Sequence, residues 1–214
     1  MLDMRAILTG PVQQMAAVTR YSHRPVIRRE NVAEHTWFVL FYAYAIGTDL
    51  RQRGYQVDLE KVFRRAIVHD LDEAVTGDFV RDFKYVVPGL AAKIKEATIH
   101  IFVKLLDQMG IGSRDAVYRD WEEAKARDLE GAIITLCDFL SVVAYVHREV
   151  SMGNRLVLPI VAEVRKYVRE VFHDASPDHQ RALDPYVQTT LEVLAELAPE
   201  PVVLQREPAH ATMA

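Results

Sequence analysis

Apolar residues recur at spacings of three and four along nearly the whole chain, which is the period of a helix packed on one side. In the segment 31–53 they fall at Val32, Trp37, Val39, Leu40, Ala43, Tyr44 and Ile46. The segment 129–152 is apolar on most faces, which predicts the central buried helix of the fold. Alternation of period two never extends beyond a few residues, so no strand is expected. The pattern predicts an all-α protein.

The composition is that of a folded protein with a full core. Of 214 residues, 50% are hydrophobic, and 26 basic against 30 acidic side chains give a net charge of −4. At about 100–200 residues per domain, this length predicts one domain, placed at residues 1–198, with a flexible tail at 199–214. The mild acidity disfavours binding to a nucleic-acid polymer, because that affinity depends on neutralising phosphates.

The sequence also predicts a compartment. Cys137 is the single cysteine, so no internal disulfide can form, as expected in a reducing cytoplasm. No segment approaches the roughly 20 uninterrupted apolar residues of a membrane span. The first residues, MLDMRAILTG, lack the apolar run of a signal peptide. We expect a cytoplasmic protein that makes no contact with membranes.

Two helix starts carry capping residues. Asn31, with Glu34 three residues later, has the pattern of a capping box, and Asp58 is placed to cap a second helix. In the helix that follows Asn31, the aromatic residues Trp37 and Phe38 are expected to lie in the core.

The first chemically informative motif is His69-Asp70, followed by Glu73 and Asp78. On a continuous helix, Glu73 lies four residues after His69 and three after Asp70, which places it on the same face. An imidazole and two carboxylates on one face suit metal-assisted hydrolysis, in which the metal lowers the pKa of water and a carboxylate relays its proton. A solvated polar face is the alternative interpretation of the His69-Asp70 pair.

Two further residues strengthen the metal interpretation. His35 lies in the first turn of the helix that begins at Asn31, and Asp138 lies within the most apolar helix. A carboxylate in such surroundings is costly unless it is paired or binds a cation, so a buried salt bridge is the alternative for Asp138. With His69 and Asp70 they supply two imidazoles and two carboxylates, which suit Mn, Co, Fe or Zn better than Mg.

The order His35, His69-Asp70, Asp138 resembles the HD-domain metal-dependent phosphohydrolases, over roughly residues 15–155. Within that superfamily the chain is most similar to the bacterial 5'-deoxynucleotidase branch. The matching segments are RENVAEH at 29–35, HDLDEAVTGD at 69–78, FKY at 83–85 and CDFLSVVAY at 137–145, with MGN following at 152–154. The resemblance implies an HD-type helical bundle in a single domain.

The resemblance also implies roles for individual residues. One divalent ion would be held by His35, His69, Asp70 and Asp138. Catalytic roles are implied for Glu73 and Asp78, with Asp78 also contacting substrate; capping of a turn is the alternative for Asp78. Which of the two is the acid and which the base stays open.

Substrate binding is implied for the pair Arg20-Tyr21, which stands where the branch has an arginine followed by tryptophan. The tyrosine is a departure that bears on substrate orientation and on the number of phosphates accepted. Arg20 also belongs to a basic cluster with Arg24, Arg28 and Arg29 just before a helix N-terminus, a favourable place for phosphate. Lys84 is a further phosphate-binding candidate, with an ordinary surface lysine as the alternative.

These features predict a metal-dependent phosphohydrolase of deoxynucleotides, most simply one that converts deoxyribonucleoside 5'-monophosphates to deoxynucleoside and phosphate. One alternative is a deoxynucleoside triphosphate triphosphohydrolase, dATP-directed and phage-like, which removes the whole triphosphate. Another is a regulatory HD protein that binds a nucleotide without turnover. The expected partner is a small-molecule deoxynucleotide, and the resemblance implies a homo-oligomer.

Overall fold

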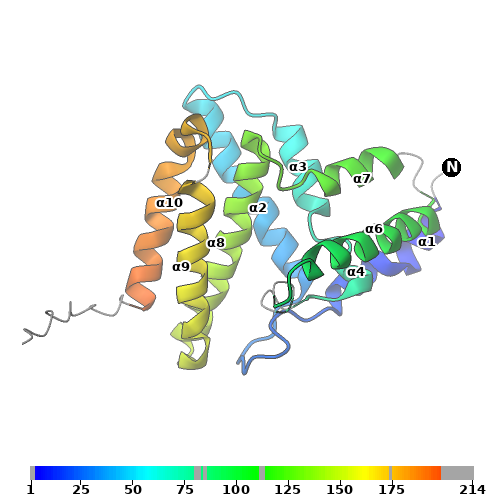
Figure 1. Ribbon diagram of the computed structural model, residues 1–214, viewed down its shortest axis with the longest axis horizontal. Helices are drawn as coiled ribbons and strands as arrows, with labels where there is room; N and C mark the ends of the chain where they lie inside the picture. Colours follow the sequence, from blue (N-terminus) through cyan, green and yellow to red (C-terminus); the bar gives the residue numbers. More distant parts are fainter. Residues whose placement is uncertain (1–2, 80–82, 84–85, 111–113, 174, 199–214) are drawn as a thin grey trace, which may run out of the picture.

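The computed structural model describes residues 3–79, 83, 86–110, 114–173 and 175–198, which are helical nearly throughout (Figure 1). Two short segments, α1 and η1, come first, and the α2–α3 pair, the one-turn α4 and α6 follow. The bounds of this first half are Met4–Thr9 (α1), Pro11–Ala16 (η1), Val32–Gln52 (α2), Leu59–Val68 (α3), Glu73–Thr76 (α4) and Leu90–Gln108 (α6). Those of the second half are Arg114–Glu122 (α7), Leu129–Ser151 (α8), Arg155–Val157 (η2), Leu158–His173 (α9) and Pro177–Leu197 (α10). No strand occurs in the described ranges, so the all-α prediction is confirmed.

Side-chain caps fix where the helices around the site begin. Asn31 and Glu34 form the predicted capping box at the start of α2, and Asp58 accepts a hydrogen bond from the Lys61 backbone at the start of α3. Asp128 caps α8 in the same way through the backbone N–H of Gly131. The caps set the register of α2 and α8, which carry two of the four predicted metal ligands.

The described helices bury two clusters of apolar side chains. The larger cluster joins α2, α3, α8, α9 and α10, with α8 between its neighbours (Figure 1). Its members include Val39, Ile133, Tyr145, Val161 and Leu183. The smaller cluster joins η1, α4, α6 and α7 to the first turn of α2, and includes Met15, Val32, Phe102 and Leu106. The two clusters meet at the N-terminal end of α2.

The central helix α8 is long and apolar enough to cross a membrane by length and composition alone, and it is the one described helix that meets this test. Over half of its most apolar window, 56%, is buried inside the molecule. It packs against α2, α3, α9 and α10. Its hydrophobicity therefore serves the protein core, as the sequence predicted.

Several details differ from the sequence predictions. His69 and Asp70 do not continue into one helix with Glu73, because α3 ends at Val68 and a tight turn follows. In that turn the N–H of Leu71 bonds the carbonyl of Val68, and the N–H of Glu73 bonds that of Asp70. The core prediction for Trp37 was wrong, since its side chain is 63% exposed on the outer face of α2.

The outcomes of the remaining predictions are mixed. Phe38, which was also predicted to lie in the core, is half-buried and packs near Tyr42. The two N-terminal elements α1 and η1 were not predicted. The tail at 199–214 and Lys84 lie outside the described residues, so the domain boundary stays a prediction.

Candidate active site

Three of the predicted metal ligands form a compact group. His35 lies in the first turn of α2, and His69 and Asp70 form the turn after α3. One donor atom from each lies within 4.8 Å of the others. His69 Nε2 is 3.4 Å from His35 Nε2 and 3.1 Å from Asp70 Oδ2. Two imidazole nitrogens and a carboxylate oxygen therefore face a common point.

Asp138 brings the fourth donor from the middle of α8. Its Oδ1 lies 3.1 Å from Nε2 of His35, whose imidazole is fully buried. The structure thus places together, from three separate segments, all four residues that the sequence singled out. Two imidazoles and two carboxylates fit a borderline divalent metal ion, because such ions accept both nitrogen and oxygen donors.

Hydrogen bonds orient both imidazole rings toward this point. Nδ1 of His69 donates to the carbonyl of Ala66 at 2.7 Å, which leaves the Nε2 lone pair directed at the donor group. Nδ1 of His35 lies 3.0 Å from Oγ of Ser141, one turn after Asp138 on α8. Partners of this kind fix the tautomer and ring orientation of metal-binding histidines.

The electrostatics keep both aspartates ionised. Burial alone opposes ionisation of Asp70, but its interactions with His69, Lys125 and His35 outweigh burial, and its pKa is held well below its usual range. Burial likewise opposes ionisation of Asp138, and the charges of Lys125 and His35 hold its pKa well below the ordinary value. Two ionised carboxylates beside two imidazoles form a pre-organised cation site.

Glu73 and Asp78 line the same cavity next to this group. Oε2 of Glu73 is buried and has no hydrogen-bond partner among the described residues. Burial, and then repulsion from Asp70, raise the pKa of the Glu73 carboxyl well above its ordinary value. Asp78 follows Gly77, whose φ of 74° belongs to the left-handed region that glycine tolerates. An unpartnered carboxyl facing a polar cavity suits proton transfer.

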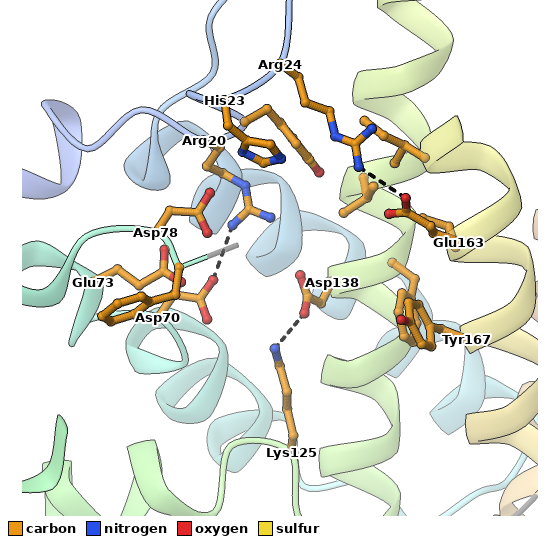
Figure 2. Close-up of a pocket in the computed structure, with 16 residues that line it drawn as sticks. Arg20, His23, Arg24, Asp70, Glu73, Asp78, Lys125, Asp138, Glu163 and Tyr167 are labelled. Carbon is orange, nitrogen blue, oxygen red and sulfur yellow. Dashed lines mark hydrogen bonds and ion pairs between the residues drawn. The ribbon is translucent and has the colours of Figure 1, made fainter. Parts of the chain in front are cut away.

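Arg20 and Tyr21 approach the cavity from the loop before α2 (Figure 2). Nη1 of Arg20 lies 3.5 Å from Asp70 Oδ2, and its Nε lies 3.7 Å from Glu30 Oε1. Tyr21 has a φ of 54° and stacks on Tyr145 with ring centroids 4.8 Å apart. Burial raises the pKa of Tyr21 to about 12, so its hydroxyl stays protonated at neutral pH. A non-glycine residue in this backbone region is strained, and such strain concentrates at functional sites.

The cavity has a volume of about 270 Å³ and two chemically different ends. Arg20, Asp70, Glu73 and Asp78 lie at one end, Asp138 and Lys125 lie next to them, and Glu163 and Tyr167 of α9 lie at the other end (Figure 2). The apolar part of the lining consists of Phe139, Val142, Ile160, Val164 and Tyr167. At its rim Nη2 of Arg24 bonds Oε1 of Glu163 at 3.1 Å, as Figure 2 shows. Among the other basic candidates, Arg28 pairs with Glu34 and is exposed, as is Arg29.

Sequence reasoning missed several residues of the site. Lys125 lies between α7 and α8, and its Nζ is 2.5 Å from Asp138 Oδ2. No motif marks it, because it falls in the charged stretch EEAKARD, where a surface lysine is the ordinary expectation. Ser141 and Glu30 were findable: Ser141 is a polar residue in an apolar helix, one turn after Asp138, and Glu30 immediately precedes the predicted cap.

Solved structures with a similar fold support the architecture. A protein from Pyrococcus horikoshii matches with a TM-score of 0.72 at 21% identity, covering 89% of this chain and 99% of the other. The cyanophage S-2L HD phosphohydrolase DatZ, solved bound to dA and one catalytic zinc ion, matches with a TM-score of 0.55 at 19% identity. That alignment covers 85% of this chain and 95% of DatZ.

Comparison with sequence relatives identifies the family. A family model described as 5'-deoxynucleotidase YfbR-like matches residues 8–181. A 5'-deoxynucleotidase from Photorhabdus laumondii is 26% identical over 156 residues, which are 72% of this chain and 79% of the relative. The fold, the group of three possible metal donors with Asp138 next to it, and these matches define a metal-dependent phosphohydrolase of the HD class. Within that class, the chain belongs to the YfbR-like 5'-deoxynucleotidase family.

Proposed function

We propose that this protein hydrolyses deoxyribonucleoside 5'-monophosphates to deoxynucleoside and inorganic phosphate. The supporting observation is a cavity whose charged end combines two of the four predicted donors, Asp70 and Asp138, with the cations Arg20 and Lys125, and whose other end carries apolar side chains of α8 and α9. A phosphate fits the charged end, and a deoxynucleoside fits the apolar end, because each end matches the polarity of that part of the substrate. The family membership agrees with this substrate class.

We further propose that His35, His69, Asp70 and Asp138 hold one divalent ion of the transition type, Co, Mn, Zn or Fe rather than Mg. When bound, such an ion polarises the phosphoryl oxygen and neutralises charge. Mixed nitrogen and oxygen donors favour these ions over Mg, which prefers oxygen ligands and water.

The chain's own residues would share the remaining work. Arg20 holds non-bridging phosphate oxygens through its planar guanidinium fork, and Tyr21 shapes the neighbouring wall. Glu73 positions the attacking water and accepts or relays its proton, with Asp78 as the second proton-transfer group. Lys84 stays a predicted phosphate contact.

Because Tyr21 stands where the branch has a tryptophan, a second substrate is an alternative. It is a deoxynucleoside triphosphate from which the whole triphosphate is removed. Arg24 also lines the cavity, and to bind an additional phosphate it would have to exchange its ion pair with Glu163 for that phosphate. A regulatory protein that binds a nucleotide without turnover remains the alternative of another class. Such a module has no evident need for the Glu73 carboxyl, whose buried Oε2 has no hydrogen-bond partner among the described residues.

Product analysis tests these assignments. The purified protein is incubated separately with dAMP and dATP, each with Mn, Co or Mg added, and metal-stripped protein serves as the control. Inorganic phosphate released from dAMP while dATP stays intact is the expected result. Deoxyadenosine and triphosphate from dATP would reassign the protein as a triphosphohydrolase, and no turnover of any deoxynucleotide would favour the regulatory alternative.

We also propose that the protein is a homo-oligomer whose copies meet through an apolar surface on α2 and α3. Trp37, Phe41, Tyr44 and Ile67 are exposed there around a groove that Leu40 and Phe63 complete. Clustered aromatic side chains are typical of interface cores, and the one charged residue that lines the groove, Arg64, pairs with Glu60 and Asp120. A two-fold axis would pair this surface with its own copy. Light scattering of the purified protein should give a dimer mass, and Trp37→Ser with Phe41→Ser should shift it to the monomer.

The cytoplasm is the compartment we propose for this activity. Cys137 is fully buried as a free thiol, and burial raises its pKa well above the ordinary value, which leaves it unreactive. Fractionation of the source cells with antibody detection tests the compartment, and recovery in a membrane or secreted fraction would contradict it.

A further inference from the structure

Lys125 is a cation of the cavity to which no motif assigns a function. It lies in the connection between α7 and α8, on the side of the donor group opposite to Arg20 in the view of Figure 2. Its Nζ is 2.5 Å from Oδ2 of Asp138, while Oδ1 of the same carboxylate faces His35 Nε2 at 3.1 Å. One oxygen of Asp138 therefore points at the metal donors and the other at Lys125.

The backbone around Lys125 is held in place by close packing. Ala124 is buried, and the N–H groups of Ala124 and Ala126 bond the carbonyls of Trp121 and Glu123. A Cβ at Gly131 would lie 2.2 Å from the carbonyl oxygen of Ala126, so only glycine permits this approach of the connection to α8. The stem of Lys125 thus starts from a fixed backbone, as a substrate-contacting residue requires.

The ammonium group of Lys125 can form further hydrogen bonds in addition to its bond to Asp138. It carries three N–H donors, and the described part of the structure gives it one hydrogen bond. Its side chain is 39% exposed and lines the cavity, so the remaining N–H groups are accessible to a ligand in the cavity.

Charge balance at the donor group favours an anionic substrate at this point. The ionised pair Asp70 and Asp138 offsets one divalent ion, and a phosphate monoester then adds up to two negative charges. Arg20 beside Asp70 and Lys125 beside Asp138 supply two positive charges on the two sides of the group. Hydrogen-bond donors such as these, which are fixed before the reaction, stabilise the negative charge that develops on the phosphoryl group without having to reorganise.

We propose that Lys125 is a substrate-contacting residue, whose ammonium bonds Asp138 with one N–H and donates another to a non-bridging oxygen of the phosphoryl group. This assignment rests on the proposed function for its substrate. If Lys125 acted only by orienting Asp138, its loss would weaken metal binding. If it contacts phosphate, its loss weakens the binding of phosphate.

The test compares Lys125→Met and Lys125→Arg with Lys95→Met, which changes an exposed lysine of α6 away from the cavity. Calorimetry measures the dissociation constant of Mn²⁺ and then, at saturating Mn²⁺, that of inorganic phosphate. Hydrolysis of dAMP is followed in parallel. Circular dichroism and thermal midpoints establish that each variant is folded.

Lys125→Met should weaken phosphate binding about tenfold and lower kcat/KM about 10²-fold, the scale found when one stabilising donor is removed. Mn²⁺ binding should be unchanged or tighter, because a nearby positive charge has been removed. Lys125→Arg, which keeps the charge, should retain phosphate binding to within about threefold, and Lys95→Met should match the wild type.

Weaker Mn²⁺ binding with unchanged phosphate affinity in Lys125→Met would overturn the proposal and leave Lys125 as a positioning residue for Asp138. If the wild type turns over no deoxynucleotide, the proposed function fails. The phosphate and Mn²⁺ measurements still decide the assignment of Lys125 in that case, because they need no turnover.

Discussion

At the scale of single residues, Glu73 is distinguished by a buried carboxyl oxygen. Its Oε2 is buried without a hydrogen-bond partner among the described residues, although an unsatisfied buried carboxyl is costly. Proteins retain such groups where a ligand or a reaction uses them. The carboxyl lines the cavity together with Asp70, which is where our proposal places the attacking water.

Glu73→Gln should therefore lower kcat for dAMP by about 10²–10⁴-fold, the range for loss of a general acid–base group. Metal and nucleotide binding should survive, because the four donors are unchanged. Steady-state kinetics and calorimetry with Mn²⁺ check both parts, with Glu96→Gln on the exposed face of α6 as the matched control. Unchanged turnover in Glu73→Gln would remove Glu73 from the catalytic machinery.

The sequence was sufficient to predict the four candidate metal ligands, but not the neighbouring cation Lys125. His35, His69-Asp70 and Asp138 stand out because each is a polar residue in a recognisable pattern or in apolar surroundings. Lys125 lies among other charged residues, and its role depends on a close approach between backbone segments that sequence patterns do not record. The roles of all these side chains stay predictions until the variants are measured.

At the scale of elements, one buried carboxylate holds the loop that presents Arg20 and Tyr21. Glu149 of α8 is fully buried and accepts hydrogen bonds from the backbone N–H groups of Ile27 and Arg28 and from Nδ2 of Asn154. Burial opposes its ionisation, but these hydrogen bonds outweigh burial and lower the pKa of Glu149.

Glu149→Gln should lower the free energy of unfolding by about 1.5–3 kcal/mol, because the new amide group faces backbone donors. Since the folded pKa is lowered, the contribution of ionised Glu149 is complete above its ordinary pKa of 4.5 and disappears as pH falls through the lowered value. Urea unfolding at several pH values checks this. The variant should lose stability less steeply in acid than Glu170→Gln, an exposed control, and parallel acid curves would contradict the assignment.

The contact between the α7–α8 connection and α8 gives a second prediction at this scale. Gly131→Ala places a Cβ 2.2 Å from the carbonyl oxygen of Ala126, so the backbone must shift. We expect a loss of about 1–3 kcal/mol of stability, although alanine ordinarily favours a helix. Phosphate affinity should also fall, because Lys125 moves with the connection. Chemical unfolding and phosphate calorimetry measure the two effects, and a stabilised variant with wild-type phosphate affinity would contradict them.

The helix starts were predictable, and the break after Val68 was not. Asn31 and Asp58 are capping residues with local partners, so a few sequence positions suffice to place the starts of α2 and α3. The turn at His69 carries no glycine or proline and depends on long-range contacts, among them the bond from Trp121 Nε1 to Asp72 Oδ1 at 2.8 Å. Trp37 was placed in the core because periodicity locates an apolar face but does not say what covers it.

At the scale of the whole molecule, the donor group ties the two apolar clusters together. His35 belongs to the turn of α2 where they meet, Asp138 comes from the larger cluster, and Asp70 precedes α4 of the smaller one. An ion bound by all of them is a crosslink between the two parts of the core.

Metal removal should therefore lower global stability. An ion at 100 times its dissociation constant stabilises the folded state by about 2.7 kcal/mol, which is roughly 5–11 °C in Tm for a chain of this size. Calorimetric scans with a chelator and with added Mn²⁺ check this. In Asp138→Asn the difference between the two scans should shrink, whereas in Asp184→Asn, at an exposed position of α10, it should persist. Identical scans of the wild type with and without metal would contradict a site formed by these residues.

The central place of α8 sets an order of events during synthesis. His35, His69 and Asp70 leave the ribosome early, and α2 and α3 can pair at once because they are neighbours along the chain. Their inner faces stay exposed for several seconds, at roughly 5–20 residues per second, until α8 emerges with Asp138. The nascent chain therefore carries an incomplete donor set and an uncovered apolar groove at the same time. One helix both completes the set of four predicted metal ligands and closes the core.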